Sequence, residues 1–207
     1  MVTTYKKVGV DITEIKKSQS VIGKIISSTH KTQKLAKVTH GFGHYAGIVQ
    51  IPGNKFLATH TDGVGTKIMI ANALKKYDTI GIDCIAMNVN DVICIGATPI
   101  SFVDYIAANK NNQAIFKKVV KGLAKGAREA RVPIIGGETA IMPDLFSGKS
   151  FAMDLAGAVV GILTKKEMVV GKSIKSGDII IGVKSSGLHS NGYTLARNVL
   201  LSKYKLN

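Results

Sequence analysis

The sequence predicts an α/β protein in which short apolar strands alternate with amphipathic helices. Strands are expected at residues 56–61, 100–107, 132–135 and 153–161. Helices are expected where apolar residues recur at helical spacing, at residues 68–74, 78–95 and 114–130. The chain has 207 residues, of which 45% are hydrophobic and only four are proline, so it can fold around a core of its own.

The first part of the chain is predicted to hold one helix and a basic connecting segment. Asp11 followed by Glu14 resembles a capping pair, and isoleucines at helical spacing extend this helix to about residue 28. Residues 29–39 are polar and basic, and residues 40–47 are rich in glycine and histidine, so neither segment suits a regular helix. Residues 29–47 therefore form either a plain connecting loop or a mobile flap whose lysines close over an anion.

The run TDGVGTK at residues 61–67 stands between a predicted strand and a predicted helix. Gly63 and Gly65 let the backbone approach a ligand closely or take a positive φ, and the amides at a helix start suit phosphate. The run matches neither the P-loop pattern nor the dinucleotide fingerprint. A bound nucleotide is the first hypothesis, and a simple turn with a capping Asp62 is the alternative.

Two polar residues share one face of the helix predicted at residues 78–95. Asn88 and Asp91 are three positions apart, whereas the apolar stripe of this helix occupies another face. An unpaired carboxylate among so many apolar residues is costly to bury. Asp91 is therefore expected to be exposed, hydrogen-bonded or bound to a metal, and a capping or surface role is the ordinary alternative.

Further acidic residues stand at the ends of predicted strands. The strand at residues 132–135 is expected to run directly into a loop, GGET at residues 136–139, which places Glu138 at its mouth. Asp154 begins the strand that follows. Carboxylates without a His/Cys ligand set suit a hard cation such as magnesium, and neighbouring glycines suit phosphate oxygens. Together these features indicate a magnesium–nucleotide site rather than a hydrolytic triad.

A change of composition indicates a boundary near residue 163. Residues 164–177 are polar and basic, and an apolar strand at 178–183, a polar glycine loop at 185–192 and a helix from Tyr193 are expected after them. One strand and one helix cannot enclose a core. We therefore expect residues 1–163 to form the first domain and residues 164–207 to form a linker and the start of an incomplete second domain.

Charge and cysteine content restrict the possible classes of protein. The net charge of +15 is concentrated toward the two ends of the chain as scattered lysines, without a dense block or aromatic interleaving, so a solvated surface is expected rather than a nucleic-acid interface. No apolar run reaches membrane-spanning length, and no signal-peptide core is found at the start. Cys84 and Cys94 are expected to be reduced, buried thiols in a cytoplasmic protein.

Five motifs, in order along the chain, closely resemble the phosphoribosylformylglycinamidine cyclo-ligase family, the aminoimidazole ribonucleotide synthetases of purine biosynthesis. They are TDGVGTK at 61–67, DTIGID at 78–83, VND at 89–91, GGETA with MP at 136–143, and SSG with HSNGY at 185–193. The similarity runs from about Tyr5 to Leu200. Members of this family are longer and carry a complete second α/β domain, so the resemblance implies a chain truncated in that domain.

The resemblance implies an enzyme that uses ATP and magnesium to close the imidazole ring of 5-aminoimidazole ribonucleotide from formylglycinamidine ribonucleotide. The amide oxygen is activated by phosphorylation, an internal nitrogen attacks the same carbon, and phosphate departs. The fold is expected to be a PurM-like N-terminal domain whose mixed sheet pairs with that of a second subunit as a barrel-like core of a homodimer. Expected partners are the small-molecule substrate and ATP, with no nucleic acid and no membrane.

Roles for individual residues also come from this resemblance. Asp62 and Asp91 are expected to hold magnesium or ATP phosphates, with Glu138 and Asp154 as further metal ligands. Lys67 and His189 are the expected catalytic residues, and a structural hydrogen bond stays the alternative for His189. A lysine of the segment at 29–39 is a further candidate for phosphate contact. The residues expected to bind ATP are Gly41, Gly43, Thr61, Asp62, Gly63, Gly65, Thr66, Asn90, Asp91, Gly136, Gly137, Glu138, Thr139, Ser190, Asn191 and Gly192.

The chain departs from the family pattern at a few positions. Ile141 stands where an acid is common, and His40 and His44 stand where glycine is more usual. These departures affect the positioning of substrate more than the reaction class. A related ATP-dependent enzyme of the selenophosphate synthetase or thiamine-phosphate kinase type, or a non-catalytic dimerisation fragment, is the alternative. The continuous match at residues 136–143 and 185–193 favours the cyclo-ligase.

Overall fold

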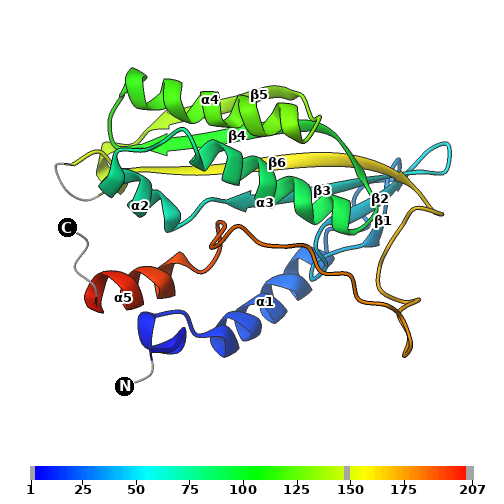
Figure 1. The fold of residues 1–207 in the computed structure, drawn as a ribbon. Coiled ribbons are helices and arrows are strands. Elements are labelled where there is room, and N and C mark those ends of the chain that lie inside the picture. Colours follow the sequence, from blue (N-terminus) through cyan, green and yellow to red (C-terminus); the bar gives the residue numbers. More distant parts are fainter. Residues whose placement is uncertain (1–2, 147–149, 204–207) are drawn as a thin grey trace.

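A twisted six-stranded mixed sheet forms the centre of the computed structural model, which describes residues 3–146 and 150–203 (Figure 1). The strand order is β1-β2-β3-β6-β4-β5. Strands β4 and β5 are parallel, and the other neighbouring pairs among the described residues are antiparallel. The strands are β1 (Lys37–His40), β2 (Gly47–Ile51), β3 (Lys55–Gly63), β4 (Thr98–Ala108), β5 (Ile134–Ile141) and β6 (Met153–Thr164).

Helices α3 and α4 cover one face of this sheet, and α1 and α5 lie beyond the β3 side of the molecule (Figure 1). Helix α3 packs against β3, β6 and β4, and α4 packs on α3. The helices are α1 (Ile12–Ser27), α2 (Lys67–Leu74), α3 (Ile80–Cys94), α4 (Gln113–Glu129) and α5 (Tyr193–Lys203), with short 3₁₀ turns η1 (Lys6–Val8) and η2 (Pro143–Leu145).

The core lies between the sheet and α3. Residues of β6 alternate strictly, so that Leu155, Val159 and Leu163 are buried under the helices while Ala156, Ala158, Val160 and Ile162 point to the opposite face. That opposite face, which we call the open face, includes Val103 and Tyr105 of β4, both of which are exposed. Among the residues that the structure describes, helices therefore cover only one side of the sheet.

Glycines allow α3 and α4 to cross at close range. A Cβ added at Gly81 would collide with the backbone of Leu123 and Val119, and one added at Gly122 would collide with the carbonyl of Asp78. Because any larger residue would force the two helices apart, these glycines fix how deeply α4 sits against α3. Helix α3 is thereby held between α4 and the strands that carry the candidate site.

The predicted α/β class and the main elements are confirmed. Strands β3, β4 and β6 and helices α1 to α4 lie where hydrophobic spacing places them. Asp11 caps α1 as predicted by accepting hydrogen bonds from the backbone of Thr13 and Glu14, whereas Glu14 pairs with Lys17 instead of closing the capping box. The strands β1 and β2 on either side of the glycine-rich residues 41–46 were not predicted, because these strands are only four and five residues long.

Three predictions about local structure are wrong. Residues 136–139 are not a loop but belong to strand β5, because a parallel register with β4 supplies the backbone partners and Gly137 leaves room for the Asp104 side chain. Residues 178–183 form no strand, because no neighbouring strand pairs with them in the described structure, and Ile180 is 95% exposed. Cys94 is exposed at the end of α3, whereas Cys84 is buried as predicted.

Within the described residues, no helix has both the length and the apolar character needed to cross a membrane.

Candidate functional site

The run TDGVGTK forms the predicted strand, loop and helix start. β3 ends at Gly63, the Val64 amide donates to the carbonyl of Leu155, and α2 begins at Lys67. Gly65 adopts a φ of +63°, a conformation that glycine takes without the steric cost of a Cβ. The Thr61 hydroxyl donates to the carbonyl of Gly157, which ties the end of β3 to β6. The glycine loop is thus anchored on both sides by backbone contacts.

A buried side chain of α3 fixes the backbone of Asp62. The Asn88 amide group accepts a hydrogen bond from the Asp62 N–H at 2.9 Å and donates to the Asp62 carbonyl at 3.1 Å. It also donates to the Cys84 carbonyl, and Asn88 has no exposed surface. The sequence placed Asn88 on the face of Asp91, and it did not indicate this positioning role, because a buried asparagine is recognised only from its partners.

Asp62 and Asp91 lie at the same interface between β3 and α3. His60 and Asp62 point to the helix-covered face of β3, and His60 Nε2 lies 3.3 Å from a carboxylate oxygen of Asp91. Asp91 is one helical turn beyond Asn88, which contacts Asp62. Asp62 itself accepts a hydrogen bond from the Gly63 amide through one carboxylate oxygen. Two of the predicted metal-binding carboxylates are therefore brought to one region.

The other predicted metal ligands lie elsewhere on the sheet. Glu138 pairs with Tyr105 and Asp154 pairs with Ala107, which places both carboxylates on the open face. β5 is separated from β3 by β6 and β4, so Glu138 is at least about 14 Å from Asp62 at the usual strand spacing. In the part of the chain that the structure describes, no three His, Cys, Asp or Glu side chains form a metal-holding group.

Residues predicted to bind ATP are likewise distributed over several elements. Thr61, Gly63, Gly65 and Thr66 surround Asp62 in the glycine loop. Gly136, Gly137 and Thr139 lie in β5 at the far edge of the sheet. Asn90 is exposed and lines a small pocket between α3 and α4, so it points away from the region of Asp62. The oxygens of Asp62 and Asp91 suit a hard cation, but Glu138 does not reach them.

The ammonium group of Lys67 contacts several protein groups in this structure. Its ammonium group lies 2.7 Å and 2.9 Å from the two carboxylate oxygens of Asp83 and also donates to the backbone carbonyl of His189. The ring of Tyr193 lies on another side, 5.3 Å from the nitrogen. The predicted catalytic role of Lys67 stays a prediction, since a phosphate would have to compete with these partners.

The second glycine loop approaches the first one. The hydroxyls of Thr66 and Thr194 are 3.1 Å apart, and His189 lies next to Lys67 through its carbonyl. The His189 ring contacts the hydroxyls of Ser185 and Ser186 at 3.4 Å and 3.3 Å, which is the structural alternative foreseen for it. Ser190 is only 7% exposed, and its hydroxyl has no hydrogen-bond partner among the described residues. Asn191 and Gly192 complete the loop before α5.

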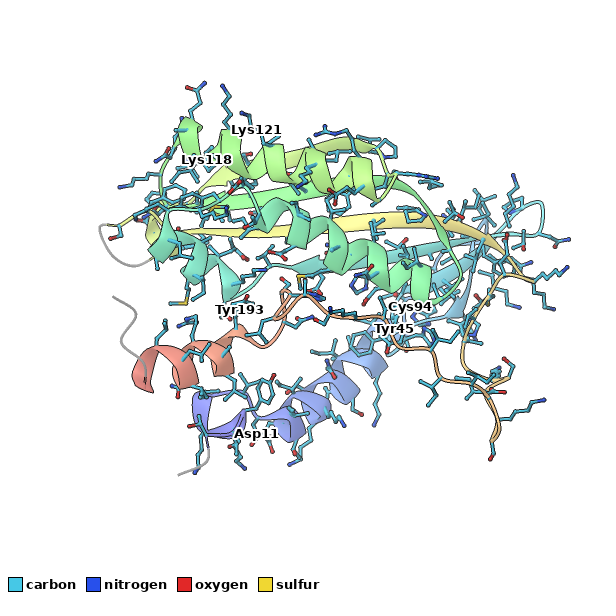
Figure 2. All side chains as sticks on the ribbon, viewed as in Figure 1. Asp11, Tyr45, Cys94, Lys118, Lys121 and Tyr193 are labelled. Carbon is cyan, nitrogen blue, oxygen red and sulfur yellow. The ribbon has the colours of Figure 1, made fainter. Side chains whose placement is uncertain are left out.

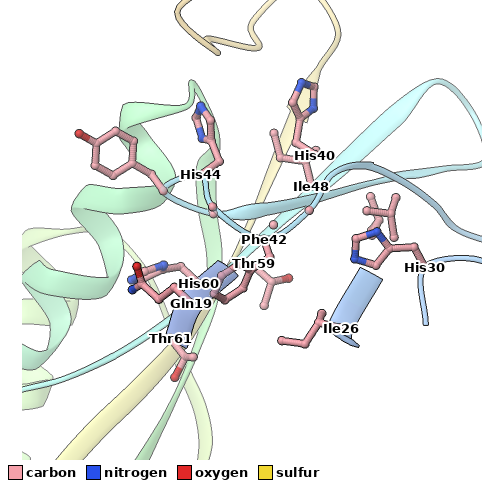
Figure 3. A pocket seen from close by; sticks show the side chains of 17 residues that line it. Gln19, Ile26, His30, His40, Phe42, His44, Ile48, Thr59, His60 and Thr61 are labelled. Atoms are coloured by element: carbon pink, nitrogen blue, oxygen red, sulfur yellow. The ribbon is translucent and has the colours of Figure 1, made fainter. Parts of the chain in front are cut away.

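A pocket of about 740 Å³ opens between α1, the residues 41–47 and the end of β3 (Figure 3). Ile26 of α1 and His30, which follows this helix, stand on one side, and His44 and His60 stand on the other side. Four of the five histidines of the chain line this pocket, together with the predicted binding residues Gly41 and Gly43. The His30 ring lies directly against Gly41, where an added Cβ would displace it.

Burial changes the acidity of two groups beneath the site. Burial raises the pKa of the Cys84 thiol, and the nearby carboxylates of Asp104 and Asp62 raise it further. Cys84 is thus a protonated core side chain rather than a nucleophile. Burial also raises the pKa of Asp104, which lies one strand beyond Gly157 in the same row as Asp62.

Solved structures of nucleotide-binding proteins share this fold. AaThiL complexed with AMPPCP and TMP is similar over 78% of this chain and 44% of its own, with a TM-score of 0.55 and 16% identity. PurL of T. maritima complexed with ATP is similar over 69% of this chain and 24% of its own, with a TM-score of 0.53 and 12% identity. At this identity the likeness establishes the fold alone.

Sequence comparison then identifies the family. The family described as "AIR synthase related protein, N-terminal domain" matches residues 43–163, more than half of the chain. The chain therefore belongs to the AIR synthase related family. Curated relatives named phosphoribosylformylglycinamidine cyclo-ligase are 49% identical in Pyrococcus furiosus and 47% identical in Methanocaldococcus jannaschii, over 99% of this chain. The aligned region covers 60% and 56% of those relatives, so this chain spans little more than half of their length.

Replacing Asn88 by leucine is expected to destabilise the protein by at least about 2 kcal/mol, because the N–H and carbonyl of Asp62 would lose their buried partner. Urea unfolding monitored by circular dichroism measures this change. Asn90→Leu is the matched control on the same helix, because Asn90 is exposed, and it should change stability by no more than about 0.5 kcal/mol. Equal effects of the two substitutions would contradict a fixing role for Asn88.

Proposed function

We propose that this chain supplies the nucleotide-binding part of a phosphoribosylformylglycinamidine cyclo-ligase, which closes formylglycinamidine ribonucleotide to 5-aminoimidazole ribonucleotide with ATP. The name of its relatives at 44–49% identity supports the reaction, because that identity extends over nearly the whole chain. The observation that carries the proposal is the meeting of the glycine loop at 61–67, two carboxylates of one interface and the second glycine loop at 185–192.

Asp62 and Asp91 are the residues that would hold a magnesium ion with the phosphates of ATP. Bound magnesium neutralises charge that develops on a transferring phosphoryl group. Asn88 keeps the backbone of Asp62 in place, so that its carboxylate does not have to be ordered when the ligand binds. In this structure His60 contacts the carboxylate of Asp91, so a metal ion would have to displace His60 or bind the carboxylate alongside it.

The pocket between α1 and the residues 41–47 is the candidate place for the substrate. Its imidazole rings can donate hydrogen bonds to the phosphate or ribose of a ribonucleotide, and the side chains of Phe42 and Tyr45 offer flat surfaces for its planar amidine part. His60 lines this pocket and also contacts Asp91. A substrate held there would therefore be adjacent to the carboxylate proposed for the metal.

The open face of the sheet is the candidate interface of a homodimer. Val103, Tyr105 and the partly buried Val160 and Ile162 form an apolar surface across β4 and β6. Such a surface favours burial against another sheet, because it removes apolar area from water. In the resemblance to the cyclo-ligase family, the first domains of two subunits pair as a barrel-like core.

A turnover assay tests the reaction itself. This chain and the longer Pyrococcus furiosus relative are each supplied with formylglycinamidine ribonucleotide, ATP and magnesium, and the release of phosphate and imidazole product is followed. We expect turnover by the relative. Turnover by this chain as well would show that the part of the relative outside the aligned region is not needed for the reaction. Phosphate release by this chain that depends on thiamine phosphate or selenide instead would contradict the proposed substrate.

Replacement of Asp62 by asparagine is expected to abolish the thermal protection that Mg-ATP gives. In the wild-type chain, ATP at about 100 times its dissociation constant should add about 2.7 kcal/mol of stability. The substitution keeps the hydrogen bond from Gly63 but removes the charge that a cation needs. Asp144→Asn is the control, since Asp144 is an exposed carboxylate in η2. Unchanged protection in Asp62→Asn would remove this residue from the metal site.

Tyr105→Lys is expected to convert a dimer into a monomer in sedimentation velocity experiments. Tyr105 is 41% exposed on the open face, and a buried ammonium group opposite its own copy would be repelled and desolvated. Val120→Lys, which places the same charge on the exposed side of α4, should leave the dimer intact. Dissociation of both variants, or of neither, would contradict the proposed interface.

A further inference from the structure

We infer that the ion pair between Lys67 and Asp83 anchors residues 185–203 against the glycine loop. Residues 185–203, which we call the docked segment, comprise the second glycine loop and helix α5. The Lys67 ammonium group donates hydrogen bonds to two different parts of the chain. Asp83 belongs to α3, whereas the carbonyl of His189 belongs to the docked segment.

The pair is sheltered, so its contacts are stronger than those of surface charges. The side chains of Lys67 and Asp83 are only 18% and 16% exposed. Both carboxylate oxygens of Asp83 lie within 3 Å of the ammonium nitrogen, which leaves the positive charge compensated. Removal of either partner would leave the other as an uncompensated, mostly buried charge. The bond to His189 thus depends on Asp83, because Asp83 fixes the position of the Lys67 ammonium group.

Other contacts surround the same point. The Tyr193 ring, at the first residue of α5, lies 5.3 Å from the ammonium nitrogen, within the range of a cation–π contact. The hydroxyl of Thr194 lies 3.1 Å from that of Thr66, the residue before Lys67. Consecutive residues of the glycine loop therefore contact consecutive residues of α5, which fixes the direction in which this helix leaves the loop.

Helix α5 needs such an anchor. It has eleven residues, and isolated helices shorter than about 12–15 residues are marginal in water. Leu188 and Leu200 of the docked segment are exposed, and Leu195 and Val199 are only partly buried, so hydrophobic burial provides only part of its attachment. Helix α5 also lies beside η1. The Lys67–Asp83 ion pair is consequently the main candidate for the interaction that keeps α5 folded and holds the two glycine loops together.

This makes Lys67 and Asp83 positioning residues for the docked segment, independently of any catalytic role. The inference does not rest on the proposed function, because the contacts join two parts of the same chain. It also assigns a role to Asp83, which the sequence did not single out as a site residue.

Hydrogen exchange of the nucleotide-free chain tests the inference, with the amides of α4 as an internal reference. The variants are Lys67→Met, Asp83→Asn and the double variant, and the control is Lys121→Met. Lys121 and Lys118 project into solvent from the outer side of α4 (Figure 2). This control therefore removes the same charge and leaves the Lys67–Asp83 ion pair in place. We expect the amides of α5, beginning with that of Ala196, to exchange at least about tenfold faster in both single variants.

The double variant should exchange no faster than the single variants, because the two residues act as one unit. Unchanged exchange of α5 in Lys67→Met would show that η1 suffices as an anchor, and it would overturn the inference. Equal acceleration in α4 and α5 would show that the pair contributes only to global stability, which overturns it as well. Failure of both single variants to fold in circular dichroism would have the same meaning.

Discussion

The hydrogen bonds between the Asn88 amide group and the backbone of Asp62 are the constraint on which the arrangement of the site depends. β3 ends at this point, and no neighbouring strand on its outer side pairs with residues 60–63 in the described structure. Asn88 supplies the missing backbone partners from α3 and is itself completely buried. The position of the glycine loop therefore follows from the position of α3. The close contact of Gly81 and Gly122 with their opposite helices then sets the depth of α3.

The two faces of the sheet divide the acidic residues into two groups. Asp62, Asp91 and Asp104 lie on the helix-covered side, whereas Glu138 and Asp154 lie on the open face. Of the four predicted metal ligands, only Asp62 and Asp91 therefore lie on the helix-covered side. If the open face is covered in a dimer, Glu138 and Asp154 lie near that interface, and their negative charges act on it.

The fold was largely predictable because its elements follow strong hydrophobic periods. The strands around Phe56, Phe102 and Leu155 and the helices α3 and α4 bury one face each, and that signal is visible in the sequence. The short strands β1 and β2 and the strand at Gly136 depend on pairing with distant residues, which a local pattern does not show. For the site, the glycine loop was recognisable from its residues, and the contact of Asp91 with His60 was not. Lys67 was singled out as a catalytic residue, whereas the role of Asp83, its partner, becomes visible only when the fold brings the two together.

The segment 179–183 has a consequence for the behaviour of the protein in concentrated solution. Ile179, Ile180, Ile181 and Val183 are each at least 86% exposed, and their run lacks charge and proline. Short windows of this composition readily add to the edge of another sheet and can seed fibrils. Asp178 and Lys184 stand directly on either side and act as gatekeepers, since stacking copies in register would bring like charges together. Salt screens those charges, so aggregation of this chain should become faster as the ionic strength rises.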